Sequence, residues 1–155
     1  MPFQTVVNDA LALGVPGKIA TGNPYSVLPQ VAEGAQVAGT GGVYAGRFGW
    51  VQPDGTVLNT DGGSGKTPDG YILNELSGSL ELGEESSLLI QEGRPVTLLT
   101  RGDVFFQLPQ GAAAVSVGDA IKCNANTGEV DQTAAVATQF VVSGNSVDGI
   151  GIMSA

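Results

Sequence analysis

The fold is decided by residues 95–108, which read PVTLLTRGDVFFQL. Two short runs rich in aliphatic, aromatic and β-branched residues, Pro95 to Thr100 and Val104 to Leu108, flank the tripeptide Arg101-Gly102-Asp103. Because glycine tolerates the positive φ that a tight turn needs, the pattern predicts two strands joined as a hairpin. The tripeptide also occurs in integrin ligands, but a turn is the simpler interpretation of a three-residue match.

Similar short runs, each ended by turn residues, continue on both sides of this stretch. Strands at this spacing, without long helical patterns between them, predict an all-β domain, a β-barrel or sandwich of jelly-roll-like kind. In the run Val43–Gln52, the alternation of a strand places Tyr44, Phe48 and Trp50 on one side, which predicts a core face. A short helix could occupy Asp131 to Ala137. The remaining runs are Val43–Gln52, Gly70–Leu76, Ser87–Gln91, Ala113–Val117, Ala120–Cys123, Gln139–Val142 and Ile150–Met153.

Composition excludes several partners. The 155 residues carry a net charge of −9, and the six basic residues are scattered along the chain. Nucleic acids and anionic membranes attract clustered cations, so we expect neither as a partner. With 24 glycines, 8 prolines and only 14% charged residues, the chain suits short strands with tight turns. We also expect no membrane span, since no apolar run approaches the required length of about 18 residues.

Residues 1–42 differ from the rest of the chain. Glycine and proline interrupt this region too often for it to build a core, yet it is too apolar for a solvated tail. We therefore predict an extended N-terminal arm over residues 1–42 and a barrel or sandwich domain over residues 43–155. Apolar side chains on such an arm need a surface to cover them, either the chain's own domain or a neighbouring molecule. The predicted contact residues are Phe3, Val6, Val7, Leu11 and Leu13.

The residue types in this sequence give little support to a catalytic or cofactor site. The chain has no histidine and one cysteine, which excludes Ser-His-Asp triads and His- or multi-Cys metal sites. Cys123 is predicted to be a small core residue. Residues 63–67, GSGKT, resemble a phosphate-binding loop, but Thr60 replaces its first glycine and Pro68 disfavours the helix that must follow. We expect no cofactor, and interpret residues 61–69 as a mobile surface loop.

Several short segments follow one another along the chain in a distinctive order: Met1–Asn8, Val15–Ala20, Asn23-Pro24, Val37–Gly39, Gly42-Val43, Gly46–Trp50, Gly93–Leu98, Gly102–Val104, Gly118-Asp119 and Asn126–Gly128. They are turns and strand starts, so their order carries more information than any single motif. In this order they resemble the cement, or head decoration, proteins of tailed bacteriophages. The similarity covers most of the chain and is weakest from Gly55 to Ser86.

This resemblance implies a β-rich protein without catalytic residues. It would bind the outer surface of the phage head, bridge subunits of the major capsid protein, and form a homotrimer, with a dimer as the alternative. It would be made in the host bacterial cytoplasm and reside on the virion. The N-terminal arm would help to clamp neighbouring capsid subunits.

Two other functions stay open. A carbohydrate-binding β module needs exposed aromatic side chains, whereas Trp50 fits a core face. A carboxylate-dependent glycosidase needs two acids in one cleft, for which Glu84 with Glu85 or Asp103 with Asp119 are formally present. Glu84 and Glu85 are sequence neighbours and would point to opposite faces of a strand.

Overall fold

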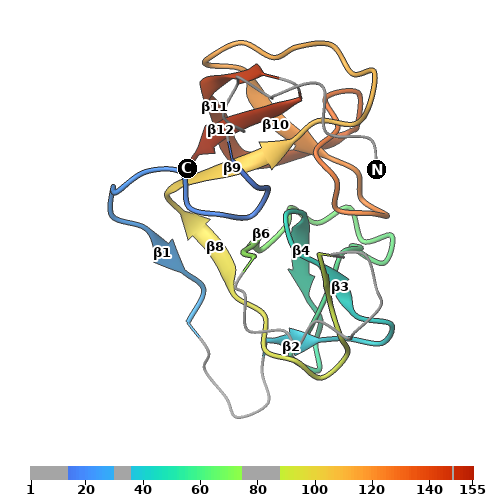
Figure 1. Cartoon of the computed structure of the whole chain (residues 1–155). Helices are drawn as coiled ribbons and strands as arrows, with labels where there is room; N and C mark the ends of the chain where they lie inside the picture. The colour runs from blue at the N-terminus through green and yellow to red at the C-terminus, as the bar shows by residue number, and fades with distance from the viewer. Residues whose placement is uncertain (1–13, 30–35, 75–87, 148) are drawn as a thin grey trace, which may run out of the picture.

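The computed structural model describes residues 14–29, 36–74, 88–147 and 149–155, which form twelve strands and no helix (Figure 1). The all-β prediction is confirmed, and the strands of the described residues pair into open sheets rather than a closed barrel. The strands are β1 (Ser26–Val27), β2 (Val37–Ala38), β3 (Val43–Tyr44), β4 (Phe48–Val51), β5 (Thr56–Leu58), β6 (Gly70–Ile72), β7 (Leu89–Ile90), β8 (Leu98–Arg101), β9 (Asp103–Gln107), β10 (Ala120–Cys123), β11 (Val136–Val147) and β12 (Ile150–Ser154).

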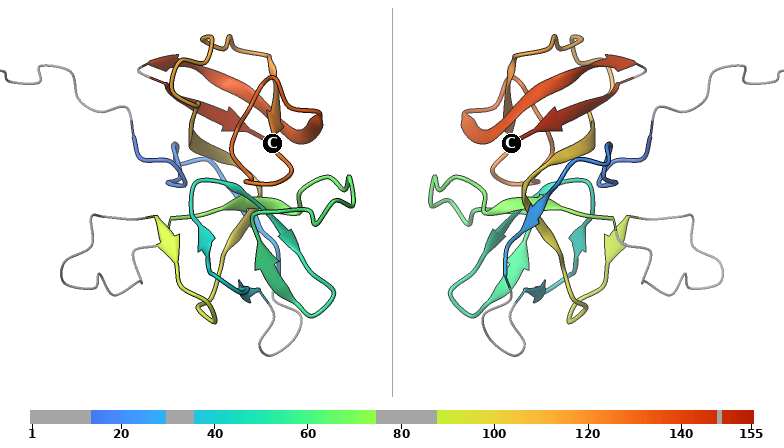
Figure 2. Two further views of the ribbon diagram at one scale, coloured as in Figure 1. Left: turned by 90° about the vertical axis from the view of Figure 1, so that its right-hand side faces the viewer. Right: turned by 90° about the vertical axis from the view of Figure 1, so that its left-hand side faces the viewer.

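The described strands form three sheets. The largest has the order β1-β8-β6-β4-β5-β2, the second has the order β10-β11-β12-β9, and β3 pairs with β7 alone. Only the β2–β5 pair among these described strands is parallel; the other pairs are antiparallel. The four-stranded sheet forms one half of the molecule and the six-stranded sheet the other, with the chain passing from β8 into β9 between them (Figures 1 and 2).

The turn at Arg101-Gly102-Asp103 is not a hairpin. Gly102 has the expected positive φ, 131°, but β8 pairs with β6 and β1 whereas β9 pairs with β12. The two apolar runs therefore belong to different sheets, and this turn is the corner at which the chain changes sheet. A Cβ on Gly102 would lie 2.5 Å from the Cβ of Tyr25, so the close approach of residue 25 also requires glycine.

The middle of the six-stranded sheet, at β6 and the start of β8, is buried on both faces. Successive residues of β6 and β8 belong to different core clusters: Tyr71 and Leu99 face the four-stranded sheet, and Ile72 and Leu98 pack with Val43 and Val57. Side chains alternate across a strand, so each of these strands supplies both cores at once. This explains why their sequences are continuously apolar rather than alternating.

Aromatic side chains join the two large sheets. Phe48 of β4 packs edge-on against Tyr71 of β6, with ring centroids 5.0 Å apart, and against Phe140 of β11, at 5.8 Å. Trp50 is also buried and its Nε1–H donates to the carbonyl of Lys66 at 2.8 Å. The core face predicted for Phe48 and Trp50 is confirmed.

Tyr44 was expected on the same core face, and that expectation is wrong. The run Val43–Gln52 is two strands rather than one, because Gly46 adopts a φ of 74° and breaks the alternation after β3. The Tyr44 side chain is 42% exposed as a result. Cys123, in contrast, is fully buried as predicted, and burial raises the pKa of its thiol to about 12.

Two further local predictions are wrong. Residues 131–137 form no helix: the Asp131 carboxylate accepts hydrogen bonds from the backbone and hydroxyl of Thr133, which makes a turn, and β11 begins at Val136. Residues 113–117 form no strand, although Val115 is buried. At the end of this second run the Ser116 N–H donates to the Asp119 carboxylate at 2.9 Å, so in both places a side-chain hydrogen bond takes a backbone group into a turn.

Residues 14–29 and 36–42 contribute to the sheets. They supply β1 and β2, which are the two outer strands of the six-stranded sheet. The division into an arm of residues 1–42 and a domain of residues 43–155 stays a prediction. Within the described ranges, no helix is long and apolar enough to cross a membrane.

Candidate functional site

The contact residues predicted on the arm, Phe3, Val6, Val7, Leu11 and Leu13, lie outside the described residues. The structure does describe the segment that follows them, residues 14–23, which we call the arm root. Its backbone runs along the outer side of β9: Gly17 N–H donates to the Phe105 carbonyl and Phe105 N–H donates to the Lys18 carbonyl, both at 3.0 Å. The arm root therefore covers the edge of the four-stranded sheet.

Side chains reinforce the arm root at Asp103, the first residue of β9. Its carboxylate accepts hydrogen bonds from the Thr21 hydroxyl at 2.6 Å, from the Asn23 amide at 2.7 Å and from the Ser154 hydroxyl. These bonds, that of Ser154 first, hold the pKa of Asp103 below its ordinary value. The carboxylate of the Arg-Gly-Asp tripeptide is thus hydrogen-bonded to residues of its own chain.

The same pKa shift bears on the glycosidase alternative. A catalytic acid needs a raised pKa, whereas the pKa of Asp103 is lowered. Its formal partner Asp119 lies in a turn and accepts from the Ser116 N–H at 2.9 Å. Glu84 and Glu85 lie outside the described residues. No group of three or more metal-ligating side chains occurs in the ranges that the structure covers.

The loop that resembles a phosphate-binding loop is organised by its own carboxylate. Asp61 is buried, and its two oxygens accept the N–H groups of Gly63 at 2.7 Å and Gly65 at 2.9 Å. Lys66 pairs with Asp69 at 3.2 Å. The backbone donors that would hold a phosphate are therefore occupied by an internal anion.

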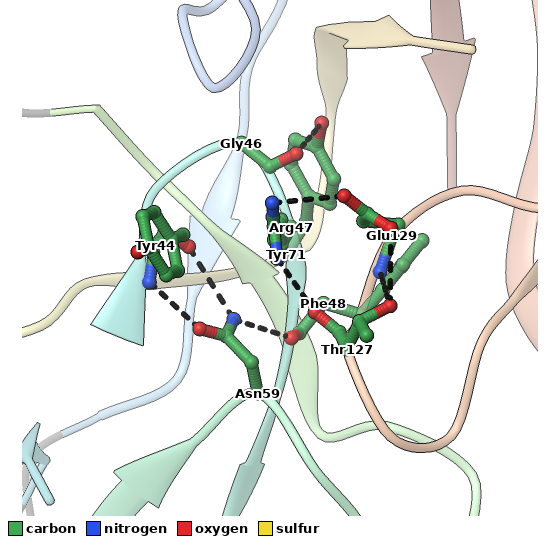
Figure 3. A network of polar contacts seen from close by, with 8 residues as sticks. All are labelled: Tyr44, Gly46, Arg47, Phe48, Asn59, Tyr71, Thr127 and Glu129. Atoms are coloured by element: carbon green, nitrogen blue, oxygen red, sulfur yellow. Dashed lines mark hydrogen bonds and ion pairs between the residues drawn. The ribbon is translucent and has the colours of Figure 1, made fainter. Parts of the chain in front are cut away.

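A cleft of about 460 Å³ lies where the two halves of the molecule meet. Tyr44, Arg47, Gln107, Gln110 and Glu129 supply its aromatic and polar lining. The Arg47 guanidinium lies 4.5 Å from the centroid of the Tyr44 ring and pairs with Glu129 at 2.8 Å (Figure 3). The cleft thus presents one aromatic side chain beside a neutralised ion pair and two amides.

Backbone contacts hold the cleft walls in place. The Asn59 side chain accepts from Tyr44 N–H at 2.7 Å and donates to the carbonyls of Tyr44 and Phe48 (Figure 3). The Tyr71 hydroxyl donates to the Gly46 carbonyl at 2.7 Å. On the opposite wall, Phe48 N–H donates to the Gly128 carbonyl at 2.7 Å, which docks the loop carrying Glu129 onto β4.

Sequence reasoning missed this cleft. Tyr44 was assigned to the core, and Arg47, Asn59 and Glu129 are separated along the chain by turns whose docking no local pattern reveals. The sequence signal that could have placed Tyr44 outside the core was Gly46, since a glycine inside an apolar run suggests a break in the strand.

These features define a small all-β protein that presents an anchored N-terminal segment and a polar cleft. The chain matches the family described as XM1 gp53 minor capsid protein over residues 3–154, and it belongs to that family. The predicted resemblance to capsid-associated proteins of tailed phages is thereby confirmed, and the chain is a capsid-associated structural protein.

A solved structure shares the fold. A chain in "The capsid of Myoviridae Phage XM1" is 16% identical, with a TM-score of 0.64 over 99% of this chain and 97% of that chain. At this identity the similarity shows the fold alone. No curated protein matches the chain.

Proposed function

We propose that this protein is a capsid decoration, or cement, protein that acts by adhesion and catalyses no reaction. It binds the outer surface of the phage head and bridges subunits of the major capsid protein. The observation that carries the proposal is membership of a minor capsid protein family over nearly the whole chain. The protein would be made in the host bacterial cytoplasm and carried on the virion.

The arm root supports a mechanical role. A bridge transmits force only if the contacting segment is firmly attached to its own domain. Residues 17–20 pair with β9, and Thr21 and Asn23 bind Asp103, so several hydrogen bonds must break together before the segment peels away. The five predicted contact residues, Phe3, Val6, Val7, Leu11 and Leu13, precede this root, and we propose that they contact the capsid or a neighbouring copy.

We further propose a homotrimer, with a dimer as the alternative. A cyclic trimer presents three identical arms and suits a local threefold position on an icosahedral shell. Light scattering with size-exclusion chromatography distinguishes the states, since a trimer has three times the mass of the chain. A monomer at every concentration tested would remove this part of the proposal.

Co-sedimentation with phage heads that lack the protein tests the proposed function. We expect saturable binding of the full-length protein and strongly reduced binding after deletion of residues 2–13, with an unchanged unfolding transition. Lys66→Ala is the control and should bind normally, because the Lys66 ammonium is exposed and, among the described residues, pairs only with Asp69 of its own loop. Absence of binding by the full-length protein would contradict the function, whereas full binding by the deletion variant would exclude only the arm.

A further inference from the structure

We propose that the cleft beside Tyr44 is a binding site for a neutral saccharide. In this arrangement one pyranose ring lies against the exposed part of the Tyr44 side chain that the Arg47 guanidinium, over the ring at 4.5 Å, leaves uncovered. Its hydroxyls exchange hydrogen bonds with Arg47, Glu129 and the two glutamine amides. This inference goes beyond capsid association, because it assigns a small-molecule site on the free protein.

The composition of the cleft matches the two kinds of surface on a sugar. A pyranose has apolar C–H faces and a rim of hydroxyls that both donate and accept. Tyr44 offers an aromatic side chain that is 42% exposed, in a cleft also lined by Pro109 and Leu108. The exposed Gln107 and Gln110 side chains make no hydrogen bond within the described part of the chain, so their amides can donate and accept toward a ligand.

The ion pair adds directional hydrogen bonds without net charge. Arg47 has five N–H donors, and within the described ranges it uses one toward Glu129 and one toward the Thr127 carbonyl. Glu129 accepts from Arg47 and from the Thr127 hydroxyl and keeps further lone pairs. Arg47 and Glu129 are the only charged residues that line the cleft in the described structure, so their charges cancel. The described lining therefore offers a phosphate or a carboxylate no net positive charge, which favours a neutral ligand.

An extended peptide fits less well. Peptides that join a strand need free backbone N–H and carbonyl groups along it. The backbone N–H and carbonyl of Tyr44 both already hydrogen-bond to the Asn59 side chain (Figure 3). At this residue β3 therefore has no free backbone group with which a peptide strand could pair. The walls are held by the Tyr71, Asn59 and Gly128 contacts before any ligand arrives, which lowers the entropy cost of binding.

The test uses the full-length protein and ¹H–¹⁵N spectra recorded during titration with methyl pyranosides of glucose, galactose, mannose, rhamnose and N-acetylglucosamine. We expect at least one to cause saturable shifts confined to amides around the cleft. Tyr44→Ala should weaken that binding at least about tenfold, which corresponds to about 1.4 kcal/mol. Tyr25→Ala is the matched control, since Tyr25 is 56% exposed and does not line the cleft, and it should bind as the unaltered protein does.

A second variant protects the test against a folding defect at Tyr44. The double change Gln107→Ala with Gln110→Ala alters two exposed side chains and should weaken binding while leaving the unfolding transition in place. Saturation by none of the five pyranosides would overturn the proposal. It would also be overturned if Tyr44→Ala and the double variant both bound normally, or if the methyl glycoside of glucuronic acid bound more tightly than that of glucose.

Discussion

The edges of the two large sheets are closed in different ways. On the four-stranded sheet the arm root covers β9, and Gln132 closes β10: its amide accepts from Lys122 N–H at 3.0 Å and donates to the Ala120 carbonyl at 2.9 Å. On the six-stranded sheet, no described strand pairs with the outer side of β1. The other outer strand of this sheet, β2, is covered by residues 93–96: Ala38 N–H donates to the Arg94 carbonyl and Val96 N–H donates to the Gln36 carbonyl, both at 2.8 Å. The four-stranded sheet therefore has both edges covered, whereas the six-stranded sheet has one.

The open edge has its own protection. β1 is only two residues long, and its register with β8 shifts between Ser26 and Val27. Along this edge Tyr25 is 56% exposed and Val27 is 38% exposed. A short, irregular edge limits uncontrolled strand addition even where apolar side chains are exposed. The four-stranded sheet thus relies on covered edges on both sides, whereas the six-stranded sheet combines one covered edge with one short edge strand.

The largest expected effect comes from separating the two halves. Phe140 on β11 is buried and contacts the rings of Phe48 and Tyr71 across the sheets. Phe140→Ala should lower the free energy of unfolding by about 4 kcal/mol through lost burial and an unfilled cavity. Urea unfolding followed by tryptophan fluorescence measures this loss. A loss below about 1 kcal/mol would mean that the halves are stable separately.

The next effect comes from the loop docked on β4. Gly128 has a φ of 69°, and a Cβ there would lie 2.3 Å from the Phe48 carbonyl oxygen. Gly128→Ala should cost about 3 kcal/mol, because both the backbone conformation and the contact become strained. Gly62→Ala is the control: its φ is 65° but nothing lies within 4 Å, so only about 1 kcal/mol is expected. Equal losses in urea unfolding would refute the steric explanation.

The stability that Asp103 gives to the arm root should depend on pH. Its folded pKa is lowered, so its stabilisation is complete above the unfolded pKa and disappears as pH falls through the folded pKa. Asp103→Asn should cost about 1 kcal/mol at neutral pH, because one acceptor oxygen replaces two, and the difference from wild type should shrink below about pH 4. Urea unfolding across this pH range measures the difference. A difference that grows in acid would contradict this account.

Hydrogen exchange localises that effect to the arm root. The Phe105 N–H is covered by the Lys18 carbonyl, so its exchange should become faster in Asp103→Asn. Asp54→Asn is the matched control, since the Asp54 carboxylate accepts hydrogen bonds from Thr56 in its own turn and from no other residue that the structure describes. Exchange at Phe105 should be the same in this control as in the unaltered protein. Equal acceleration in both variants would mean that Asp103 does not act through the arm root.

The smallest effect concerns the closed edge at β10. Gln132→Ala leaves Lys122 N–H and the Ala120 carbonyl without their side-chain partner. We expect a loss of about 1 kcal/mol in urea unfolding, together with increased self-association, because an uncovered edge can pair with another chain. Sedimentation velocity measures the association.

The control for this edge is the same substitution at another exposed glutamine. The Gln110 side chain makes no hydrogen bond within the described residues, so Gln110→Ala should leave both the stability and the association state unchanged. If the Gln132→Ala variant self-associates no more than the Gln110→Ala variant, the side chain of residue 132 does not protect the edge of the sheet.

Sequence reasoning succeeded where local pattern and tertiary packing agree. The strand at 120–123 was predicted with its observed bounds, and the buried positions of Phe48, Trp50 and Cys123 follow from alternation and from residue size. It failed where a glycine redirects the chain: Gly46 takes Tyr44 out of the core, and Gly102 carries the chain into another sheet. Such turns are recognisable as turns, but their consequence depends on which strands pair afterwards.

The candidate sites were less predictable than the fold. The cleft depends on contacts between residues as distant as Arg47 and Glu129, which no local spacing encodes. The arm root depends on Asp103 meeting Thr21 and Asn23, which lie 82 and 80 residues away in the chain. The family resemblance was recognisable because it rests on the order of turns rather than on any site.

If the protein stabilises the head by adhesion, as we propose, its binding should raise the temperature at which heating releases the packaged DNA. Heads with and without bound protein are warmed in the presence of a DNA-binding dye, and occupancy is measured on the same samples. We expect decorated heads to release DNA at a higher temperature than bare heads, and the rise should be proportional to occupancy. Release at the same temperature from fully decorated and bare heads would contradict the proposal.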